Sequence, residues 1–359
     1  MDIDYILLPS LIALTCLLLA YLCIRCTLSS RSKRFGTTRR VAERLALSLA
    51  ILMTLGLAVS SALNTAMFAS LRHDPPGRLY LVNGYRMRLD CSGTGAPTLV
   101  LESGLGYGGL GWAGVQPMLA RTTRVCSYDR AGYGWSVPQP TPNDADHIAS
   151  RLHALLAAAH ISGPIVLMGQ SLGGIYIRDF AARYPTMISG LVFVDSSVPF
   201  MDRHGVPLPT APQWLLQTAL STGIAYWALR LEYPRAPAVA IEDTCFTNLN
   251  TAAAELANFD RSSAEVERTP SFGSLPILIL SHDPALDLHD RPELRRIMLK
   301  ADAMQPELLK LSTRSRRIIV RGSGHAIQFF RPRLLAQQVA LFIHQIRDSA
   351  PPSAHVPRS

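Results

Sequence analysis

Charged residues are scarce in this chain: they make up 17% of its 359 residues, whereas hydrophobic residues make up 48%. The net charge of +9 gathers near the start, where seven basic residues between positions 25 and 44 are opposed only by Glu43. The rest of the chain has no basic stripe interleaved with aromatic residues, which is the usual footprint of nucleic-acid binding. We therefore expect no nucleic-acid partner.

Motifs that hold metal ions or nucleotides are also missing. The six cysteines form no CxxC pair followed by further metal ligands, so the sequence predicts no zinc site. No lysine follows the glycine-rich segment at 102–109, as it does in a phosphate-binding loop. We expect neither a metal nor another cofactor.

The cysteines outside the N-terminal segment leave two readings open. Cys91, Cys126 and Cys245 permit one disulfide and one free thiol, or three buried reduced thiols. The candidate pair for a disulfide is Cys91 with Cys126, because both lie at or near early strands.

Two long apolar runs occupy the first seventy residues. Residues 5–24 and 45–71 are each long enough to cross a bilayer as a helix, and the basic loop between them is typical of a cytoplasmic connection. We expect residues 1–72 to form a leader with two transmembrane helices that contact membrane lipid. In this orientation the chain is a multi-pass protein of a bacterial inner membrane, and its main domain, residues 73–350, lies on the periplasmic side.

Beyond a linker at 73–77, short β-rich runs alternate with helical patterns. Runs at 79–82 and 86–91 flank Asn83-Gly84, a dipeptide typical of a two-residue hairpin turn. Several later runs are apolar at nearly every position, as in strands covered on both faces. This alternation predicts a mostly parallel sheet with helices on both faces. Further strands are expected at 98–101, 124–128, 165–168, 191–194, 277–280 and 318–320, and helices at 145–159, 172–184, 292–311 and 333–347.

The alternation breaks between residues 198 and 274. This insertion is rich in aromatic and aliphatic residues and has helix-like pieces near 213–229 and 252–258. We expect it to form a helical cap over the active site. The tail at 351–359 is expected to be disordered.

The clearest chemical motif is Gly169-Gln170-Ser171-Leu172-Gly173-Gly174, which follows an apolar strand and opens a helical pattern. In that context GxSxG is typical of a nucleophile elbow, a tight turn that exposes the serine hydroxyl. We predict that Ser171 is a nucleophile and that the N–H of Leu172 stabilises a developing oxyanion.

A serine hydroxyl needs a base, and the chain has ten histidines. His325 ends a glycine-rich segment, residues 321–325, that follows the last expected strand and precedes the final helix. Such a loop can bring an imidazole to the carboxyl edge of the sheet, where Ser171 is expected. We therefore predict His325 as the base. Weaker candidates by position are His204, His282 and His289.

The third catalytic group should be a carboxylate that orients the imidazole. In the chain order serine, acid, histidine, Asp283 comes shortly after the expected strand 277–280 and is the predicted acid. Asp287, four residues later, and Asp195, at the end of the preceding strand, are the alternatives.

The second oxyanion donor is expected in the glycine-rich loop at 102–109, after the strand 98–101. Its glycines let the backbone approach a substrate closely. We predict the N–H of Leu105 as this donor, acting together with that of Leu172.

Five segments in this order resemble the α/β-hydrolase superfamily, over about residues 78–347. The resemblance is nearest to bacterial esterase-like members with a membrane leader. It implies the α/β-hydrolase fold and the roles predicted above, and it places Asp129 and Arg130 in a loop beside the site. The segments are LESGLGYGGLGW at 101–112, VCSYDRAGYGWS at 125–136, GQSLGG at 169–174, VDSS at 194–197 and GSGHAIQFFRP at 322–332.

The favoured function is hydrolysis of a small, apolar carboxylic ester through an acyl-enzyme. Dehalogenase and epoxide-hydrolase members of the superfamily have aspartate at the elbow, so Ser171 disfavours both activities. A peptidase or thioesterase would use the same catalytic residues. A non-catalytic binding module of the same fold is the alternative from a different class.

Overall fold

The computed structural model describes residues 75–202, 212–221, 223–245, 249–269, 271–286 and 291–349, together with scattered positions between 48 and 66. The chain forms two compact units. The larger consists of Pro75–Thr210 and Tyr233–Ser359, and the smaller of Met1–Asp74 and Ala211–Glu232.

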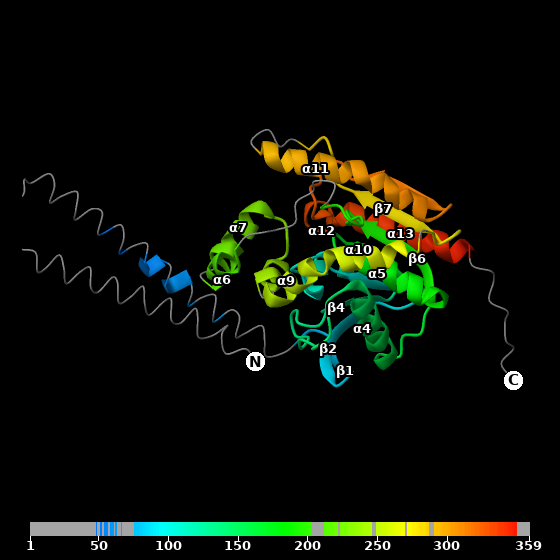
Figure 1. Ribbon diagram of the computed structural model, residues 1–359, viewed down its shortest axis with the longest axis horizontal. Helices are drawn as coiled ribbons and strands as arrows, with labels where there is room; N and C mark the ends of the chain where they lie inside the picture. The colour runs from blue at the N-terminus through cyan, green and yellow to red at the C-terminus, as the bar shows by residue number, and fades with distance from the viewer. Residues whose placement is uncertain are drawn as a thin grey trace, which may run out of the picture. The chain divides into compact units, whose positions relative to one another are not determined.

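The larger unit is built on an eight-stranded sheet with the order β1-β2-β4-β3-β5-β6-β7-β8 (Figure 1). The strands β1 and β2 pair antiparallel, as do β2 and β4, and all other neighbours pair parallel. The predicted fold class, a mostly parallel sheet opened by a hairpin, is confirmed. The strands are β1 (Arg78–Val82), β2 (Tyr85–Ser92), β3 (Thr98–Glu102), β4 (Val125–Tyr128), β5 (Ile165–Gln170), β6 (Ile188–Val194), β7 (Ile277–Ser281) and β8 (Ser315–Ile319).

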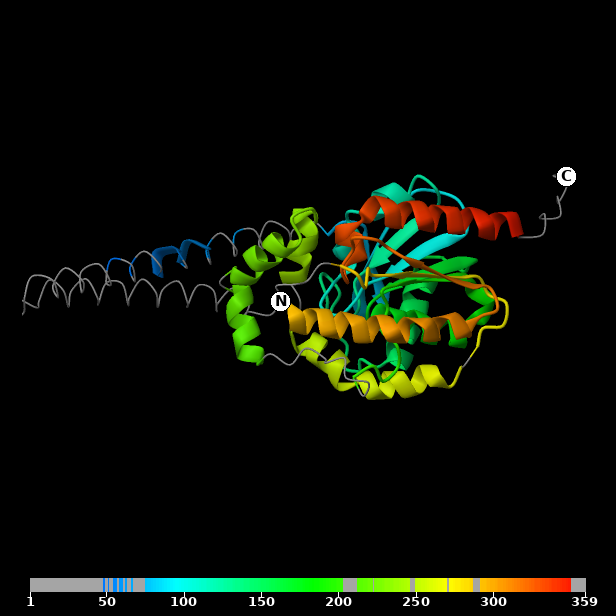
Figure 2. The same ribbon diagram turned by 90° about the horizontal axis from the view of Figure 1, so that it is seen from above.

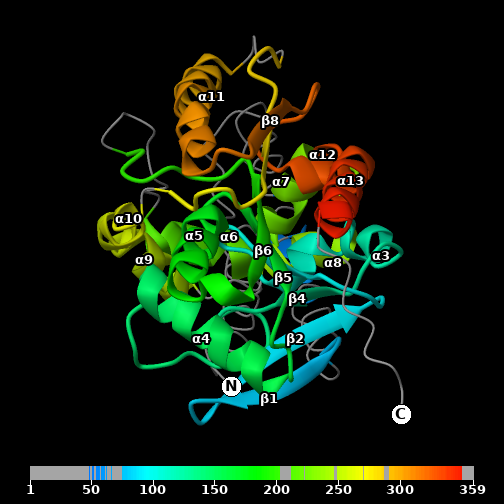
Figure 3. The same ribbon diagram turned by 90° about the vertical axis from the view of Figure 1, so that its right-hand side faces the viewer.

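Helices cover both faces of this sheet. Figure 3 shows α4 (Ala145–Ala158) and α5 (Gly173–Arg183) on one face and α3 (Gln116–Leu119) and α13 (Pro332–Ser349) on the other. In Figure 2, α11 (Pro292–Met304, orange) and α13 (red) run in nearly the same direction, as expected for helices that return along a parallel sheet.

The pleat of the central strands divides their side chains between two cores. Val100 and Leu167 pack with α4 and α5, whereas Leu99 and Val166 pack with α3 and α13. Every residue of β3, β5 and β7 is buried. The continuous apolar runs in the sequence are therefore explained by burial on both faces.

The first hairpin turns as the sequence predicts. Asn83 and Gly84 have φ values of 53° and 84°, which suit the two central positions of a type I′ turn. On the next strand pair, Cys91 of β2 lies opposite Cys126 of β4 and is joined to it by a disulfide. Of the two readings that the cysteines left open, the structure has the disulfide.

The expected helix at 292–311 is divided in two. It consists of α11, which ends at Met304, and a 3-10 helix η3 (Gln305–Leu311). Pro306 lacks a backbone N–H and disfavours the α conformation in the residue before it, which accounts for the change. The last strand lies earlier than expected, at Ser315–Ile319 rather than 318–320.

The insertion at 198–274 holds more helices than predicted. Its part in the larger unit contains α8 (Ala238–Cys245), α9 (Leu249–Ala257) and α10 (Phe259–Glu267). The smaller unit contains α6 (Gln213–Ser221) and α7 (Ile224–Glu232). The expected tail at 351–359 lies outside the described residues.

The membrane prediction needs correction. The first expected span, 5–24, and most of the second, 45–71, lie outside the described residues. No helix within the described part of the chain is both long enough and apolar enough to cross a bilayer. The predicted multi-pass topology, with lipid contact through two spans and a periplasmic main domain, is therefore unsupported.

Candidate active site

Ser171 lies on a sharp turn between β5 and α5. Its φ of 51° is in the left-handed region, which is strained for a residue with a side chain. The flanking glycines make this turn possible, because a Cβ on Gly169 would lie 2.6 Å from the carbonyl oxygen of Gly173, and one on Gly173 2.8 Å from that of Glu102. The turn therefore exposes Ser171 at the carboxyl end of the central strand.

The imidazole of His325 lies beside this serine. His325 comes from the loop between β8 and α12 (Ile327–Phe330), and its Nε2 is 3.0 Å from Ser171 Oγ. On the other side of the ring, Nδ1 is 2.7 Å from Asp195 Oδ2. Three groups of suitable chemistry thus form one hydrogen-bonded chain from hydroxyl to imidazole to carboxylate.

Asp195, which the sequence offered as an alternative, occupies the position expected for Asp283. It follows β6 directly, has a φ of 44° and is 5% exposed. Burial would raise its pKa, but hydrogen bonds from two histidines outweigh burial and hold the pKa of Asp195 well below its usual range.

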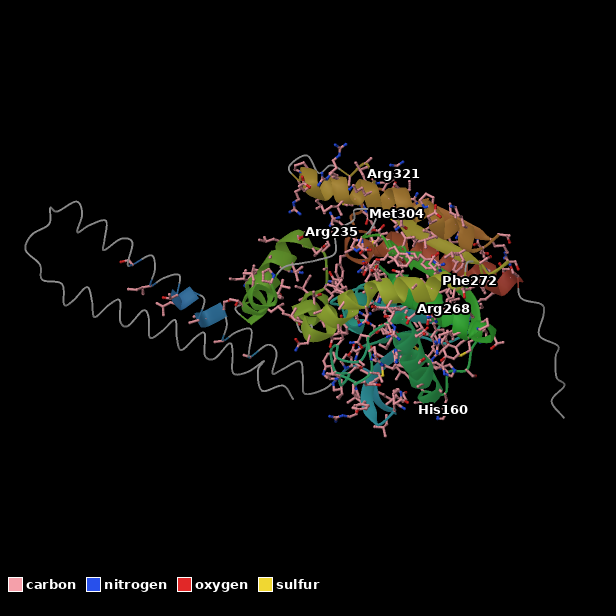
Figure 4. All side chains as sticks on the ribbon, in the orientation of Figure 1. His160, Arg235, Arg268, Phe272, Met304 and Arg321 are labelled. Carbon is pink, nitrogen blue, oxygen red and sulfur yellow. A yellow bond between two sulfur atoms is a disulfide. The ribbon has the colours of Figure 1, made fainter. Side chains whose placement is uncertain are left out.

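Asp283 is turned toward a different loop. Its Oδ2 accepts a hydrogen bond of 2.8 Å from the N–H of Gly322, and its Oδ1 lies 3.2 Å from Arg321. The bond from Gly322 lowers the pKa of Asp283. Arg321 is exposed at the surface (Figure 4). Asp283 therefore ties the loops after β7 and β8 together. Asp287 lies outside the described residues.

The residues that carry the two predicted oxyanion donors line the same cavity as Ser171. Leu105 and Leu172 both line it, and neither backbone N–H has an acceptor within the described part of the chain. Gly104 packs closely here: a Cβ on it would lie 2.2 Å from Gln170 Oε1 and 3.1 Å from Ser171 Cβ. A side chain at position 104 would therefore displace the amide of Gln170 and crowd Ser171.

The buried side chain of Arg130 holds the loop after β3 through hydrogen bonds to its backbone. Arg130 donates 2.6 Å and 2.8 Å hydrogen bonds to the carbonyls of Ser103 and Gly104. In a trans peptide the N–H points opposite to the C=O, so the Leu105 N–H faces away from Arg130. The guanidinium is itself paired with Glu102 of β3 and Glu255 of α9, at 2.7 Å and 2.8 Å.

The cavity beside Ser171 has a volume of about 340 Å³. Ser171, His325 and Asp195 are among the polar residues that line it. Much of the remaining wall is apolar, and the insertion and α11 contribute the side chains of Leu256, Phe259, Leu294, Ile297, Met298 and Ala301. A site of this kind suits an apolar ligand with one polar reacting group.

No cluster of three potential metal ligands occurs among the residues that the structure describes. The polar groups that line the cavity include a hydroxyl, an imidazole and a carboxylate, which can donate and accept protons.

Comparison with known proteins agrees with the fold. Residues 99–338 match the family model described as Alpha/beta hydrolase family, and the chain belongs to this family. A Gibberella zeae protein called AB hydrolase superfamily protein is 27% identical over 284 residues, which cover 70% of this chain and 87% of that protein.

Two further fungal relatives match shorter stretches. An uncharacterized Schizosaccharomyces pombe protein is 43% identical over 82 residues, 23% of this chain and 15% of that protein, so the matched stretch is a small part of the relative's length. An uncharacterized vacuolar membrane protein of Saccharomyces cerevisiae is 34% identical over 104 residues, 28% of this chain and 16% of its own. That name refers to a fungal vacuolar membrane, and the predicted localisation in a bacterial inner membrane is wrong.

Solved structures with the same fold belong to several hydrolases. The epoxide hydrolase CorEH aligns with 75% of this chain and 99% of its own, with a TM-score of 0.58 and 18% identity. A thermophilic esterase from Thermogutta terrifontis aligns with 75% of this chain and 98% of its own, with a TM-score of 0.53 and 19% identity. At these identities the likeness establishes the fold alone.

Proposed function

We propose that the protein is a serine hydrolase that cleaves a carboxylic ester through an acyl-enzyme. The observation that carries the proposal is the hydrogen-bonded chain from Ser171 through His325 to Asp195, with distances of 3.0 Å and 2.7 Å. Ser171 is the nucleophile, His325 the general base and Asp195 the group that orients the imidazole. This assignment replaces Asp283 as the acid.

In the first half of the reaction His325 Nε2 takes the proton of Ser171 Oγ as the oxygen attacks the ester carbonyl. The carbonyl oxygen becomes negative and is stabilised by the N–H groups of Leu105 and Leu172. The protonated imidazole then passes its proton to the leaving alcohol. The same groups activate a water molecule that hydrolyses the acyl-enzyme.

The choice of an acyl substrate follows from the nucleophile. If the Ser171 hydroxyl attacked the saturated carbon of an epoxide or haloalkane, the product would be an ether, which has no carbonyl for water to attack. Attack on an ester gives an acyl-enzyme that water can release. The apolar wall of the 340 Å³ cavity favours a small, apolar acyl or alcohol group. We propose further that the helices of the insertion that belong to the larger unit, α8 to α10, act as a cap over this cavity, to whose wall Leu256 and Phe259 contribute.

The first test is labelling of the full chain with a fluorophosphonate probe, which reacts with activated serines. We expect wild type to be labelled, Ser171→Ala to lose labelling, and His325→Ala to react at least about 100-fold more slowly, because the base is gone. His147→Ala is the matched control, since His147 also pairs with a carboxylate, Asp144, but at the start of α4. Labelling of His147→Ala should equal wild type.

Two results would overturn the proposal. Labelling that persists in Ser171→Ala would show that another residue reacts. Folded wild type that is not labelled and does not hydrolyse p-nitrophenyl esters of any chain length would leave the binding module as the better explanation. Thioester and peptide substrates assayed beside the esters separate the alternatives that use the same catalytic residues.

A further inference from the structure

A second histidine contacts the carboxylate of Asp195. His282 follows β7 directly and is 1% exposed. Its Nδ1 lies 2.8 Å from Asp195 Oδ1, whereas His325 Nδ1 lies 2.7 Å from Oδ2. Each oxygen of this carboxylate therefore faces one imidazole. The backbone N–H of His282 also donates a hydrogen bond to Oδ1 of Asp195, at 3.0 Å.

The other ring nitrogen of His282 faces a second acceptor. Nε2 lies 3.1 Å from the backbone carbonyl oxygen of Met298 in α11. A carbonyl and a carboxylate can only accept hydrogen bonds, and a neutral imidazole has a single N–H. In a neutral His282 one buried nitrogen lone pair would face an oxygen lone pair, which is unfavourable. Only the imidazolium satisfies both contacts.

The surrounding charges favour the same protonation state. Burial lowers the pKa of His282, but the hydrogen bond and the attraction of Asp195 outweigh burial and raise it. Asp302 of α11 adds to this attraction and is itself paired with Arg317 of β8. The next residue, Asp283, is directed at Gly322 and Arg321.

We propose that His282 is a permanently protonated positioning residue, which holds Oδ1 of Asp195 and offsets its charge while Oδ2 orients His325. This inference rests on the proposed function, in which His325 is the base. The positive charge of His282 weakens the attraction of Asp195 for a proton on His325. That charge therefore opposes a proton on His325, which as the base must be free to accept the Ser171 proton.

The direct test is the protonation state of His282 in the wild-type full chain. Histidine labelled with 15N on the ring, assigned through its own backbone resonances, should show both nitrogens of His282 protonated from about pH 6 to 8. A ring that carries one proton at pH 6 would overturn the proposal. This measurement needs no variant, so it stands even if substitution at position 282 prevents folding.

The functional test is the pH profile of kcat/KM. His282→Gln keeps an amide donor for Asp195 but loses the charge, so the acidic limb of the profile should move up by about one pH unit. His153→Gln, which replaces a histidine stacked on Tyr184, should leave the limb in place. If His282→Gln lowers activity equally at all pH values, the residue is only structural and the proposal is wrong.

The two proposals fail in different ways. If the wild-type chain shows no serine labelling, the proposed function fails, while the NMR measurement still reports the state of His282. If Ser171 is labelled but His282 is neutral at pH 6, the inference about His282 fails alone.

Discussion

Asp195 and Asp283 are both acidic side chains at the carboxyl ends of neighbouring strands, yet they meet different partners. Asp195 lies between two imidazoles, whereas Asp283 meets the N–H of Gly322 and the exposed Arg321. In the sheet β6 lies between β5 and β7. Asp195 follows β6 and is therefore next to the turn after β5 that carries Ser171, whereas Asp283 is one strand further away. The backbone confirms this proximity, because the Ser171 N–H donates to the carbonyl of Val194 at 3.2 Å.

The two aspartates can be separated by matched substitutions. We expect Asp195→Asn to lower kcat by about 10³- to 10⁴-fold, because the amide no longer holds His325 in the tautomer that accepts the serine proton. Asp283→Asn should stay within about three-fold of wild type, since the side chain of Asp283 bonds Gly322 and Arg321 rather than His325, and Asn keeps an oxygen for the N–H of Gly322. Steady-state kinetics on a p-nitrophenyl ester measures both. The reverse order of effects would restore Asp283 as the acid.

The residues that could be predicted from the sequence are those with a local signature. Ser171 and His325 each stand in a short glycine-rich segment next to a strand, and the structure brings these two together. The choice of Asp195 over Asp283 depends on side-chain direction after two adjacent strands, and both strands are followed by an aspartate. The sequence predicts for His282 only a weaker role as a base, because its contact with Asp195 joins residues 87 positions apart.

At the scale of secondary-structure elements, the insertion and the glycine-rich loop after β3 are joined through buried charges. Glu255 of α9 pairs with Arg130, which donates hydrogen bonds to the carbonyls of Ser103 and Gly104 in the loop after β3. Tyr133 donates a further bond to Glu255, at 3.0 Å. The order of this loop therefore depends on a helix more than a hundred residues away in the chain, which no local pattern in the sequence indicates.

A conservative change of Arg130 tests this link. Arg130→Lys keeps the positive charge near Glu102 and Glu255 but cannot hold both carbonyls with a planar fork. We expect kcat to fall by about 10- to 100-fold with KM nearly unchanged, because the Leu105 N–H is no longer held in the orientation that stabilises the oxyanion of the transition state. Arg178→Lys is the control, since Arg178 is also buried and pairs with Glu267, away from the cavity. An equal fall in both variants would assign Arg130 to stability alone.

At the scale of the whole molecule, buried carboxylates make stability depend on pH. Burial, and the nearby charge of Asp129, raise the pKa of Asp243 in α8 from 3.8 to about 8. Burial also raises the pKa of Asp179 in α5 to about 7. Both groups hold a proton in the folded chain at pH values where the unfolded chain has lost it. The folded state thus binds more protons, and the free energy of unfolding falls as pH rises through this range.

The effect of Asp243 can be isolated by removing its charge. Because folding raises the pKa of Asp243, its contribution to stability is complete below the unfolded-state pKa of 3.8. This contribution is lost as pH rises through the folded-state pKa of about 8. We therefore expect the Tm of wild type to fall between about pH 6 and 9, and the Tm of Asp243→Asn to fall less, so that the variant is the more stable protein at pH 9. The carboxylate of Asp243 accepts hydrogen bonds from the backbone N–H groups of Gly108 and Gly111, and the side-chain oxygen of Asn can accept the same bonds.

The control is Asp348→Asn, which makes the same charge change at an exposed position and should follow wild type. Thermal melts of the three proteins in matched buffers measure this, and Tm values of wild type and Asp243→Asn that change in parallel from pH 6 to 9 would mean that Asp243 is already ionised in the folded chain at pH 6.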